Sequence, residues 1–244
     1  MALFQKIDLP ANGRRWAISD VHGCLKTLKK LVWEHIRLDV QDQLFFLGDY
    51  IDRGPSGAGV VDFIMELQNT GYQVYPLRGN HEQMLLDAWT RFQKEEAQEK
   101  QEKDFRQLVR DPSMVDAAQN CLIPRFEQWM NQLPHYYESG DFYLVHAGFN
   151  LKKPNPFEHT YAMLWTMFFN EKRYIADQAN HKTIVIGHQK TPLDAIKDAV
   201  NRKAKVVPLD NGCYKNDDAS LGQLCALNLD DWVLYSQKNI DYFF

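Results

Sequence analysis

Five short apolar segments of this 244-residue chain each run into polar residues that stand beside glycine. Their compact apolar character predicts buried β-strands, at residues 14–19, 43–47, 73–77, 142–145 and 183–186. In chain order, the segments lead into the motifs SDVHG, GDYIDRG, RGNHE, VHAG and GHQ. Ligands and catalytic groups of α/β proteins gather outside the carboxyl ends of the strands. The pattern therefore predicts that the polar side chains of these motifs meet at one site.

Helices are predicted between the first strands, which makes the chain an α/β protein. Apolar residues recur at helical spacing within residues 25–34 and again within residues 60–68. Later strands are predicted at residues 205–209, 222–228 and 232–236, and the last two are predicted to form a hairpin. Antiparallel strands that follow βαβ units indicate either one mixed sheet or two sheets packed face to face. The simplest arrangement is a single domain over residues 1–244.

The middle of the chain has a different character. Residues 84–134 are predicted to be mainly helical, and the prolines at 112, 124 and 134 divide the region into pieces. Its charge-rich run at residues 94–103 is typical of a solvated helix face. We therefore expect a helical insertion that is able to cap a cleft.

Composition and charge are those of an ordinary globular protein. Hydrophobic residues make up 45% of the chain, and the formal net charge of -4 argues against nucleic acid as a partner, because nucleic-acid binders carry a basic excess. The four cysteines form no CxxC pair, so we interpret them as reduced thiols. No segment approaches the ~20 apolar residues of a membrane helix. Because residues 1–15 also lack an apolar signal core, we expect no membrane partner and a cytoplasmic location.

The residue types at the strand ends are those that bind divalent metal ions. Two ions about 3.5–4 Å apart require a bridging carboxylate together with imidazole, carboxylate and amide ligands. The motifs supply this set in Asp20, His22, Asp49, Asn80, His146 and His188. Asn80 also has a structural interpretation as a helix N-cap, with Glu82 favourable in the first turn. That role and metal binding are compatible. His188 taken alone is more typical of an ordinary strand-end histidine, and only the joint pattern of five strand ends favours a ligand.

Together, the five motifs closely resemble the phosphoprotein-phosphatase branch of the calcineurin-like metallophosphoesterases. That branch includes bacterial and phage serine/threonine phosphatases and symmetrical diadenosine tetraphosphate hydrolases. The resemblance extends from Trp16 to Gly212, with the motifs in the family's order. It implies an α/β sandwich of two mixed β-sheets flanked by helices.

The resemblance also implies roles for the candidate ligands. Asp20 and His22 are expected to bind the first ion, and Asp49 is expected to bridge both ions. The second ion is expected to be completed by Asn80, His146 and His188. Manganese is the metal that the resemblance favours, and oxygen and imidazole ligands also admit iron or zinc.

The implied activity is metal-dependent hydrolysis of a phosphate ester, in which a hydroxide that bridges the two ions attacks the phosphorus in line. Two ions lower the pKa of water toward neutrality and screen the charge of the phosphate. The departing alkoxide needs a general acid, worth about 10²–10⁴-fold in rate. His81 is the candidate acid, with Asp52 orienting its imidazole. Arg53 is expected to bind a phosphate oxygen through its guanidinium, whereas Arg78 is expected to form a structural ion pair.

One position departs from the family pattern. Phosphatases of this branch commonly carry a second phosphate-binding arginine shortly after a tryptophan, and the matching stretch at residues 164–169 has Met167 in that place. A thioether donates no hydrogen bond to phosphate, so a charge-assisted contact of roughly 1.5–3 kcal/mol is missing unless Arg173 folds back into the site. The departure leaves the metal ligands unaffected.

Three functions stay open at this point. The first is hydrolysis of phosphomonoesters, with phosphoserine and phosphothreonine proteins as substrates. The second is cleavage of diadenosine tetraphosphate or other nucleotide phosphoesters. The third is a non-catalytic phosphate-binding module, which the complete ligand set disfavours. The partner is accordingly a phosphorylated protein or a small phosphoester, and the oligomeric state is not indicated.

Several polar residues lack a surrounding motif. His35, His135, His159 and His181 are expected to be ordinary surface or helix residues. The segment 209–213 is either a tight turn or part of the wall of the site. Tyr214 is left unassigned.

Overall fold

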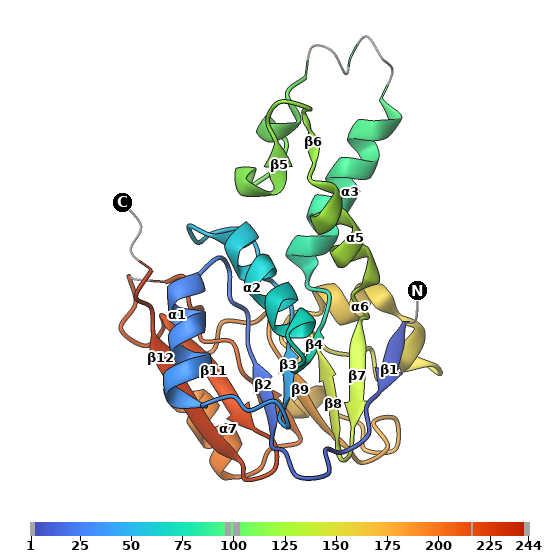
Figure 1. Cartoon of the computed structure of the whole chain (residues 1–244). Helices are drawn as coiled ribbons and strands as arrows, with labels where there is room; N and C mark the ends of the chain where they lie inside the picture. The colour runs from blue at the N-terminus through green and yellow to red at the C-terminus, as the bar shows by residue number, and fades with distance from the viewer. Residues whose placement is uncertain (1–2, 96–98, 100–102, 216, 242–244) are drawn as a thin grey trace.

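Two five-stranded sheets form the centre of the computed structural model, which describes residues 3–95, 99, 103–215 and 217–241 (Figure 1). In order across the first sheet, the strands are β12 (Val233–Lys238), β11 (Gln223–Asn228), β2 (Arg15–Ile18), β3 (Gln43–Phe46) and β4 (Gln73–Pro76). In order across the second sheet, they are β1 (Phe4–Lys6), β7 (Tyr136–Ser139), β8 (Phe142–Val145), β9 (Thr183–Ile186) and β10 (Val206–Pro208).

Both sheets are mixed, which confirms the predicted α/β sandwich. In the first sheet β2, β3 and β4 run parallel, whereas β11 is antiparallel to both of its neighbours. In the second sheet β8, β9 and β10 run parallel, and β7 is antiparallel to β8. Each sheet therefore contains three adjacent parallel strands, whose carboxyl ends lie along one edge.

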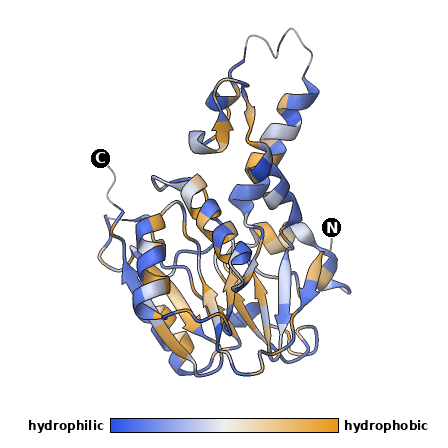
Figure 2. Ribbon diagram, viewed as in Figure 1, coloured by the Kyte–Doolittle hydropathy of each residue, from blue (hydrophilic) through white to orange (hydrophobic). Residues whose placement is uncertain are grey.

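Side chains of each strand alternate between the space between the sheets and the helices outside. Ala17 and Phe45 belong to the cluster that also contains Phe142 and Leu144 of the second sheet. Their neighbours Trp16, Ile18, Leu44 and Phe46 belong to a cluster on the outer face of the first sheet. This period of two is what a strand buried on both faces requires. Figure 2 shows the apolar residues concentrated in the sheets and on the helix faces that cover them.

Helices cover the outer faces and one side of the sandwich. The first sheet carries the helices α1 (Leu25–Lys30), α2 (Gly57–Asn69), α3 (Asn80–Lys94) and α5 (Pro124–Gln132), with a π-helical turn at Leu31–His35. On the second sheet lies α6 (Thr160–Trp165), while α7 (Leu193–Asn201) contacts both β10 and β12. Short 3-10 turns lie at Phe105–Gln107, Pro112–Met114, Pro156–Glu158 and Glu171–Arg173.

The insertion at 84–134 is only partly helical, so that prediction was too simple. Between α3 and α5 lies a two-stranded hairpin of β5 (Val115–Asp116) and β6 (Cys121–Leu122), which stands beside α3 away from the main sheets (Figure 1). The Asp116 carboxylate accepts the N–H groups of Ala118 and Gln119 at 2.9 and 3.1 Å. Such a local side-chain turn competes with helix. The predicted charged helix face at residues 94–103 lies largely outside the described residues.

Two further features of the described residues bear on the sequence predictions. Cys24, Cys121, Cys213 and Cys225 are free thiols. Across the described ranges, no helix combines the length and the apolar character that crossing a membrane requires.

Candidate metal centre

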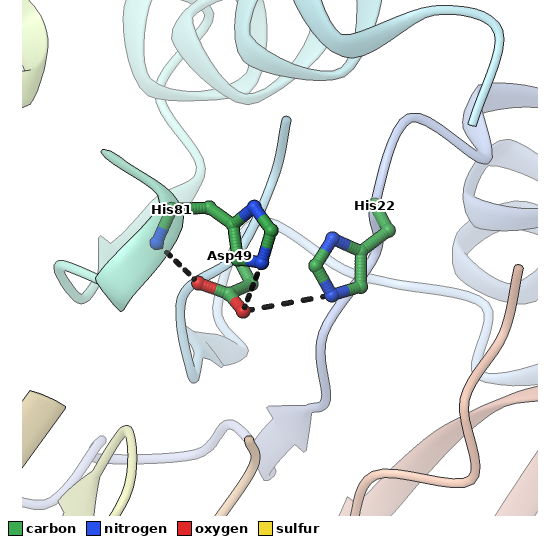
Figure 3. Close-up of side chains that lie close together, drawn as sticks. All are labelled: His22, Asp49 and His81. Carbon is green, nitrogen blue, oxygen red and sulfur yellow. Dashed lines mark hydrogen bonds and ion pairs between the residues drawn. The ribbon is translucent and has the colours of Figure 1, made fainter. Parts of the chain in front are cut away.

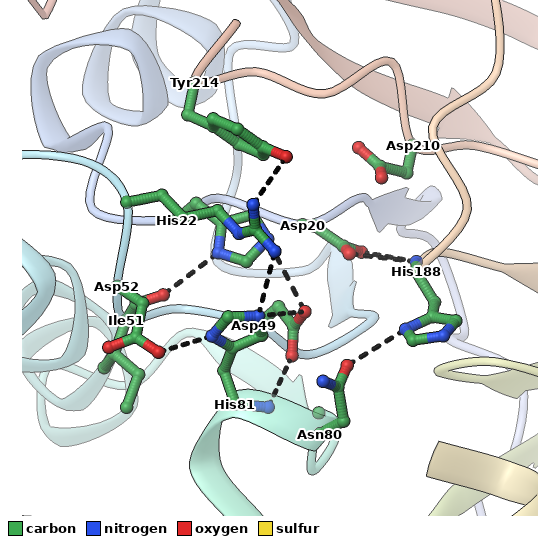
Figure 4. A network of polar contacts seen from close by, with 12 residues as sticks. Asp20, His22, Asp49, Ile51, Asp52, Asn80, His81, His188, Asp210 and Tyr214 are labelled. Carbon is green, nitrogen blue, oxygen red and sulfur yellow. Dashed lines mark hydrogen bonds and ion pairs between the residues drawn. The ribbon is translucent and has the colours of Figure 1, made fainter. Parts of the chain in front are cut away.

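The polar residues that follow the parallel strands lie together where the two sheets meet. His146, directly after β8, hydrogen-bonds through Nδ1 to the carbonyl of Leu47, directly after β3, at 2.8 Å. Asp20 and His188 follow β2 and β9, and both carboxylate oxygens of Asp20 accept the His188 N–H, at 3.1 and 2.9 Å (Figure 4). These contacts join strand ends of different sheets, as the strand-end pattern predicted.

One group of ligand atoms contains Asp49, His146 and His188, whose ligand atoms lie within 4.8 Å of one another. The side-chain oxygen of Asn80 lies between the two imidazoles, 2.8 Å from His146 Nε2 and 2.9 Å from His188 Nδ1. Because Leu47 accepts the Nδ1–H of His146, the Nε2 of the neutral ring carries a lone pair that faces the lone pairs of the amide oxygen. A cation removes this conflict, so the donor set fits a divalent metal ion.

A second group contains His22, Asp49 and His81, again with ligand atoms within 4.8 Å of one another (Figure 3). The Nδ1 of His22 hydrogen-bonds to the carbonyl of Ile51 at 3.0 Å, which directs its Nε2 to a point 3.5 Å from Asp49 Oδ2. Asp49 is shared by both groups. It therefore occupies the position that a bridging carboxylate requires.

Asp20 is placed differently from the other candidate ligands. It is buried and its oxygens are engaged by the backbone of His188, and it belongs to neither of the two groups. In the group of His22 and Asp49 the third ligand atom comes from His81. Gly187 permits this packing, because a Cβ there would lie 2.0 Å from Asp20 Oδ1.

His81 and Asp52 form the pair that the sequence predicted. Asp52 Oδ2 accepts a short hydrogen bond from His81 Nδ1, and both side chains are buried (Figure 4). Burial alone lowers the pKa of His81, but the hydrogen bond to Asp52 and the charge of Asp49 outweigh it and raise that pKa above its usual value. The surroundings of His81 therefore favour the protonated form, which a general acid needs.

Arg53 lies at the exposed side of this pair. Its guanidinium donates to the Tyr214 hydroxyl at 2.8 Å and lies 4.7 Å from the centre of the Tyr214 ring. Another guanidinium nitrogen lies 3.5 Å from His81 Nε2. The ring of Tyr214 also meets that of His22 edge-on, with centroids 5.0 Å apart. Tyr214, which the sequence left unassigned, thus belongs to the site.

Five of the site residues adopt left-handed backbone conformations. The φ angles are +46° at His22, +53° at Asp49, +66° at Asp52, +69° at Arg53 and +62° at His188. Such conformations cost of order 1–3 kcal/mol at a residue other than glycine, and they cluster at functional sites where the surrounding structure imposes them. The sharp backbone turns after the strands therefore cost stability, and they place these side chains at the site.

Glu82 is a buried residue whose role the sequence did not reveal. Its carboxylate accepts the N–H groups of Asp49, Tyr50 and Gly79 at 3.0, 2.8 and 3.0 Å. The N-cap of α3 is Gly79, so the prediction of Asn80 as the cap was wrong by one residue. A glutamate three residues after an N-cap is the signal that identifies this contact in a sequence. By holding the loop after β3, Glu82 positions the shared Asp49.

The electrostatics of the site favour bound cations. Burial lowers the pKa of His22 and of His188 to about 4, so both imidazoles are neutral and available as ligands at neutral pH. Burial also raises the pKa of Asp210 to about 6 and, together with the charges of Asp210 and Asp49, that of Asp20 above its usual range. Asp49 differs, because the surrounding imidazoles outweigh burial and hold its pKa below its usual range. Several buried carboxylates this close together are stabilised by a bound positive charge.

A comparison with protein families agrees with this geometry. The family described as calcineurin-like phosphoesterase matches residues 13–235 of the 244-residue chain. The chain belongs to this family.

Two relatives of this phosphoesterase carry different names. It is 40% identical over 87 residues to serine/threonine-protein phosphatase 1 of Salmonella typhimurium strain LT2, a match that covers 35% of this chain and 38% of the relative. It is 30% identical over 136 residues to the symmetrical bis(5'-nucleosyl)-tetraphosphatase of Pseudomonas putida strain W619, which covers 54% of this chain and 41% of the relative. The matches thus span about two-fifths of the length of these curated relatives.

The fold of the phosphoesterase also occurs in solved structures. A protein serine/threonine phosphatase of Saccharomyces cerevisiae superposes with a TM-score of 0.61 at 13% identity, over 99% of this chain and 84% of the other. At that identity the similarity concerns the fold alone.

An open pocket of about 230 Å³ lies over the metal-binding groups of the phosphoesterase. Four candidate ligands line it, His22, Asp49, Asn80 and His188. The other lining residues are His81, Arg53, Met167, Lys190, Asp210 and Tyr214. Met167, predicted to stand in place of an arginine, is 51% exposed at this pocket. Arg173 does not replace it, because the Arg173 guanidinium donates to the Met167 carbonyl at 2.7 Å and lines a separate cavity.

A larger groove of about 560 Å³ adjoins the site on the side of the insertion. Asp52 and His81 line its inner end, and residues of α3 and of the segment 108–110 line the rest. Arg91 and Arg110 are among them, and neither side chain forms a hydrogen bond or an ion pair with the described part of the chain. Residues of the insertion thus line a groove beside the site, which agrees with the expectation that the insertion is able to cap a cleft.

The remaining polar residues singled out in the sequence lie outside the metal-binding groups. Arg78 has a structural role, because its guanidinium donates hydrogen bonds to the Gln83 side chain and to the Met130 carbonyl, both at 2.8 Å. His35 hydrogen-bonds to Gln237 at 2.8 Å, and His181 lies 3.4 Å from Asp177 at the surface. His159 is the N-cap residue of α6 and His135 is partly buried near the start of β7.

Proposed function

We propose that this calcineurin-like phosphoesterase is a two-metal phosphatase that hydrolyses phosphomonoesters. The observation that carries the proposal is the position of Asp49, whose carboxylate belongs to two groups of ligand atoms at once. A shared carboxylate is the feature that distinguishes a binuclear centre from two unrelated ion sites.

His22 and Asp49 are proposed to hold one ion and Asp49 also to bind the other, with manganese in both positions. Asp20, which lies outside the two groups and accepts the His188 N–H, is proposed as a further ligand of the first ion on the strength of the family resemblance. The second position is completed by Asn80, His146 and His188. When bound, the ions supply a nucleophile at neutral pH and neutralise the charge of the phosphate. The protein holds the imidazoles for this task through backbone carbonyls, since Ile51 and Leu47 accept their second ring N–H.

The protein's own groups are proposed to handle the leaving group and the phosphate. His81, whose pKa is raised by Asp52 and Asp49, donates a proton to the departing alkoxide oxygen. Asp52 keeps the ring oriented through Nδ1, so that Nε2 points to the pocket. Arg53 is exposed beside His81 and is proposed to bind a non-bridging phosphate oxygen.

The proposed substrate is a phosphoserine or phosphothreonine protein. The pocket over the metal groups is small and open, as a phosphate on a protein surface requires. The similarity to serine/threonine-protein phosphatase 1 supports this choice over the part of the chain that it covers.

A second candidate, cleavage of a dinucleotide polyphosphate, is favoured by the larger groove. Its volume of about 560 Å³ suits a small ligand, and Arg91 and Arg110 offer charge to a nucleoside phosphate. The similarity to a symmetrical bis(5'-nucleosyl)-tetraphosphatase points in the same direction. A non-catalytic phosphate-binding module is the third candidate, and the pairing of His81 with Asp52 argues against it.

A substrate profile with added Mn²⁺ tests the proposal. A phosphoserine peptide, 4-nitrophenyl phosphate and diadenosine tetraphosphate are compared at equal enzyme concentration. The proposal expects manganese-dependent release of phosphate from the first two. Turnover of the dinucleotide alone would contradict the proposal and support the second candidate. If no substrate is turned over and no metal is bound, the third candidate is supported instead.

A further inference from the structure

The pocket of the proposed phosphatase lacks a cation where one is expected. Met167 presents a thioether at its rim, and Arg173 is occupied at the carbonyl of Met167 on the far side. Besides the proposed metal ions and His81, a phosphomonoester dianion is expected to contact cationic side chains. Arg53 and Lys190 are the arginine and lysine side chains among the residues that line the pocket.

Lys190 reaches the pocket from the sheet opposite to that of Arg53. It lies two residues after His188 in the loop that leaves β9, whereas Arg53 lies in the loop that leaves β3. The loop of Lys190 is anchored on both sides, because Gln189 N–H donates to the Gly187 carbonyl at 2.6 Å and Thr191 N–H to the Asp210 carbonyl at 2.8 Å. These backbone hydrogen bonds therefore fix the position from which the Lys190 side chain extends.

The stem of Lys190 is also held in place. It lies over Gly212, where a Cβ would be 3.2 Å from Lys190 Cγ and 3.3 Å from Cδ. Gly212 has a φ of +64° and donates its N–H to Asp210 Oδ1 at 2.6 Å, so glycine serves both the turn and the passage of the lysine. The segment 209–213, predicted as either a turn or a wall, thus combines both roles.

The ammonium group of Lys190 is available to a ligand. The residue is exposed, and its side chain forms no hydrogen bond or ion pair with the residues that the structure describes. Asp210 is the nearby buried carboxylate, and the charges of Lys190 and Arg53 both act on it. Both cations thus project their charge into the same pocket from different walls.

We propose that Lys190 binds the phosphoryl group of the substrate and supplies the positive charge that Met167 does not. An ammonium on a flexible stem donates to a phosphate oxygen as a point charge, without the planar fork of arginine. The inference rests on the proposed function, since it assigns a role in the same pocket. It adds a phosphate-binding residue that none of the five sequence motifs includes.

Lys190→Met tests the proposal, with inorganic phosphate as the probe. Competitive inhibition of 4-nitrophenyl phosphate hydrolysis by phosphate is measured with the manganese-loaded enzyme. Loss of one charge-assisted contact is expected to raise the inhibition constant by about 10-fold or more. The matched control is Lys215→Met, because a Cβ at Gly212 would also lie 3.4 Å from Lys215 Cγ, whereas Lys215 pairs with Asp217 at 3.4 Å and does not line the pocket. It is expected to change the constant less than about twofold.

Two further variants separate binding from a structural role. Lys190→Arg is expected to keep phosphate affinity within about threefold, and Met167→Arg is expected to restore much of it in the Lys190→Met background. Manganese content, measured on each variant, is expected to equal that of the wild type. An unchanged inhibition constant in Lys190→Met, or equal losses in Lys190→Arg and Lys190→Met, would overturn the role of Lys190. Failure of the wild-type enzyme to hydrolyse any phosphoester would instead overturn the proposed function.

Discussion

The floor and the rim of the pocket are built in different ways. On the floor, Asp49 and His22 are buried at 2% and 4% exposure, and neighbouring backbone or side-chain groups orient each of them. On the rim, Met167 is 51% exposed, and Arg53 and Lys190 project from loops. Under the proposed function, the floor would determine the reaction class, whereas the rim would determine how the phosphate is held and which substrate is accepted. Substitutions on the two surfaces are expected to act on different kinetic quantities.

The largest effect within the catalytic pair is expected for His81→Asn. Turnover of an alkyl phosphate, whose leaving group needs a proton, is expected to fall by about 10²–10⁴-fold. Turnover of 4-nitrophenyl phosphate is expected to fall much less, because the aryl oxide leaves without protonation. Steady-state rates on both substrates measure the difference, with His35→Asn as a control at the surface. Equal losses on the two substrates would contradict the general-acid role.

Asp52→Asn is expected to change the pH dependence of the same step. The hydrogen bond to Asp52 raises the pKa of His81, so the acid form persists to higher pH and activity falls as pH rises through that pKa. Removing the charge of Asp52 lowers the pKa, so the alkaline limb of kcat on an alkyl phosphate moves to lower pH. A limb that stays in place would show that another group titrates there.

Glu82→Gln tests whether Glu82 holds the metal-binding residues at the floor of the pocket in place. An amide oxygen cannot replace a carboxylate that accepts four backbone N–H groups, that of Ile51 at 3.4 Å among them, so the loop that carries Asp49 loses its anchor. Residues that orient metal ligands typically contribute about 10–100-fold in metal affinity. Manganese affinity, measured by titration calorimetry, is expected to fall within that range. Glu66→Gln on the exposed face of α2 is the control, and an equal effect there would point to a general loss of stability.

The smallest effect is expected on the rim, for Tyr214→Phe. The substitution removes the hydroxyl that accepts from Arg53 at 2.8 Å and keeps the ring below the guanidinium. Loss of one such hydrogen bond amounts to about 0.5–1.5 kcal/mol. KM for 4-nitrophenyl phosphate is expected to rise by at most about 10-fold, with manganese content unchanged. A loss of bound manganese would show that the rim and the floor are not independent.

The same division explains how much the sequence predicted. The floor was predictable because each motif directly follows an apolar strand, and the parallel order of those strands brings their ends together. The strands β1 and β7 were missed, since FQK and YYES are short and lack an alternating apolar pattern. The rim depends on tertiary placement, so the positions of Lys190 and Tyr214 against the site had no local signal. Glu82 had such a signal, three residues after the cap at Gly79.

Manganese stoichiometry of the wild type and of Asp49→Asn tests the shared carboxylate most directly. Elemental analysis and calorimetric titration are expected to give two manganese ions per chain for the wild type and fewer for the variant. Turnover in Asp49→Asn is expected to fall by roughly 10³-fold, since several kcal/mol of charge stabilisation depend on the paired ions. Two manganese ions and wild-type turnover in Asp49→Asn would contradict a binuclear centre that is bridged by Asp49.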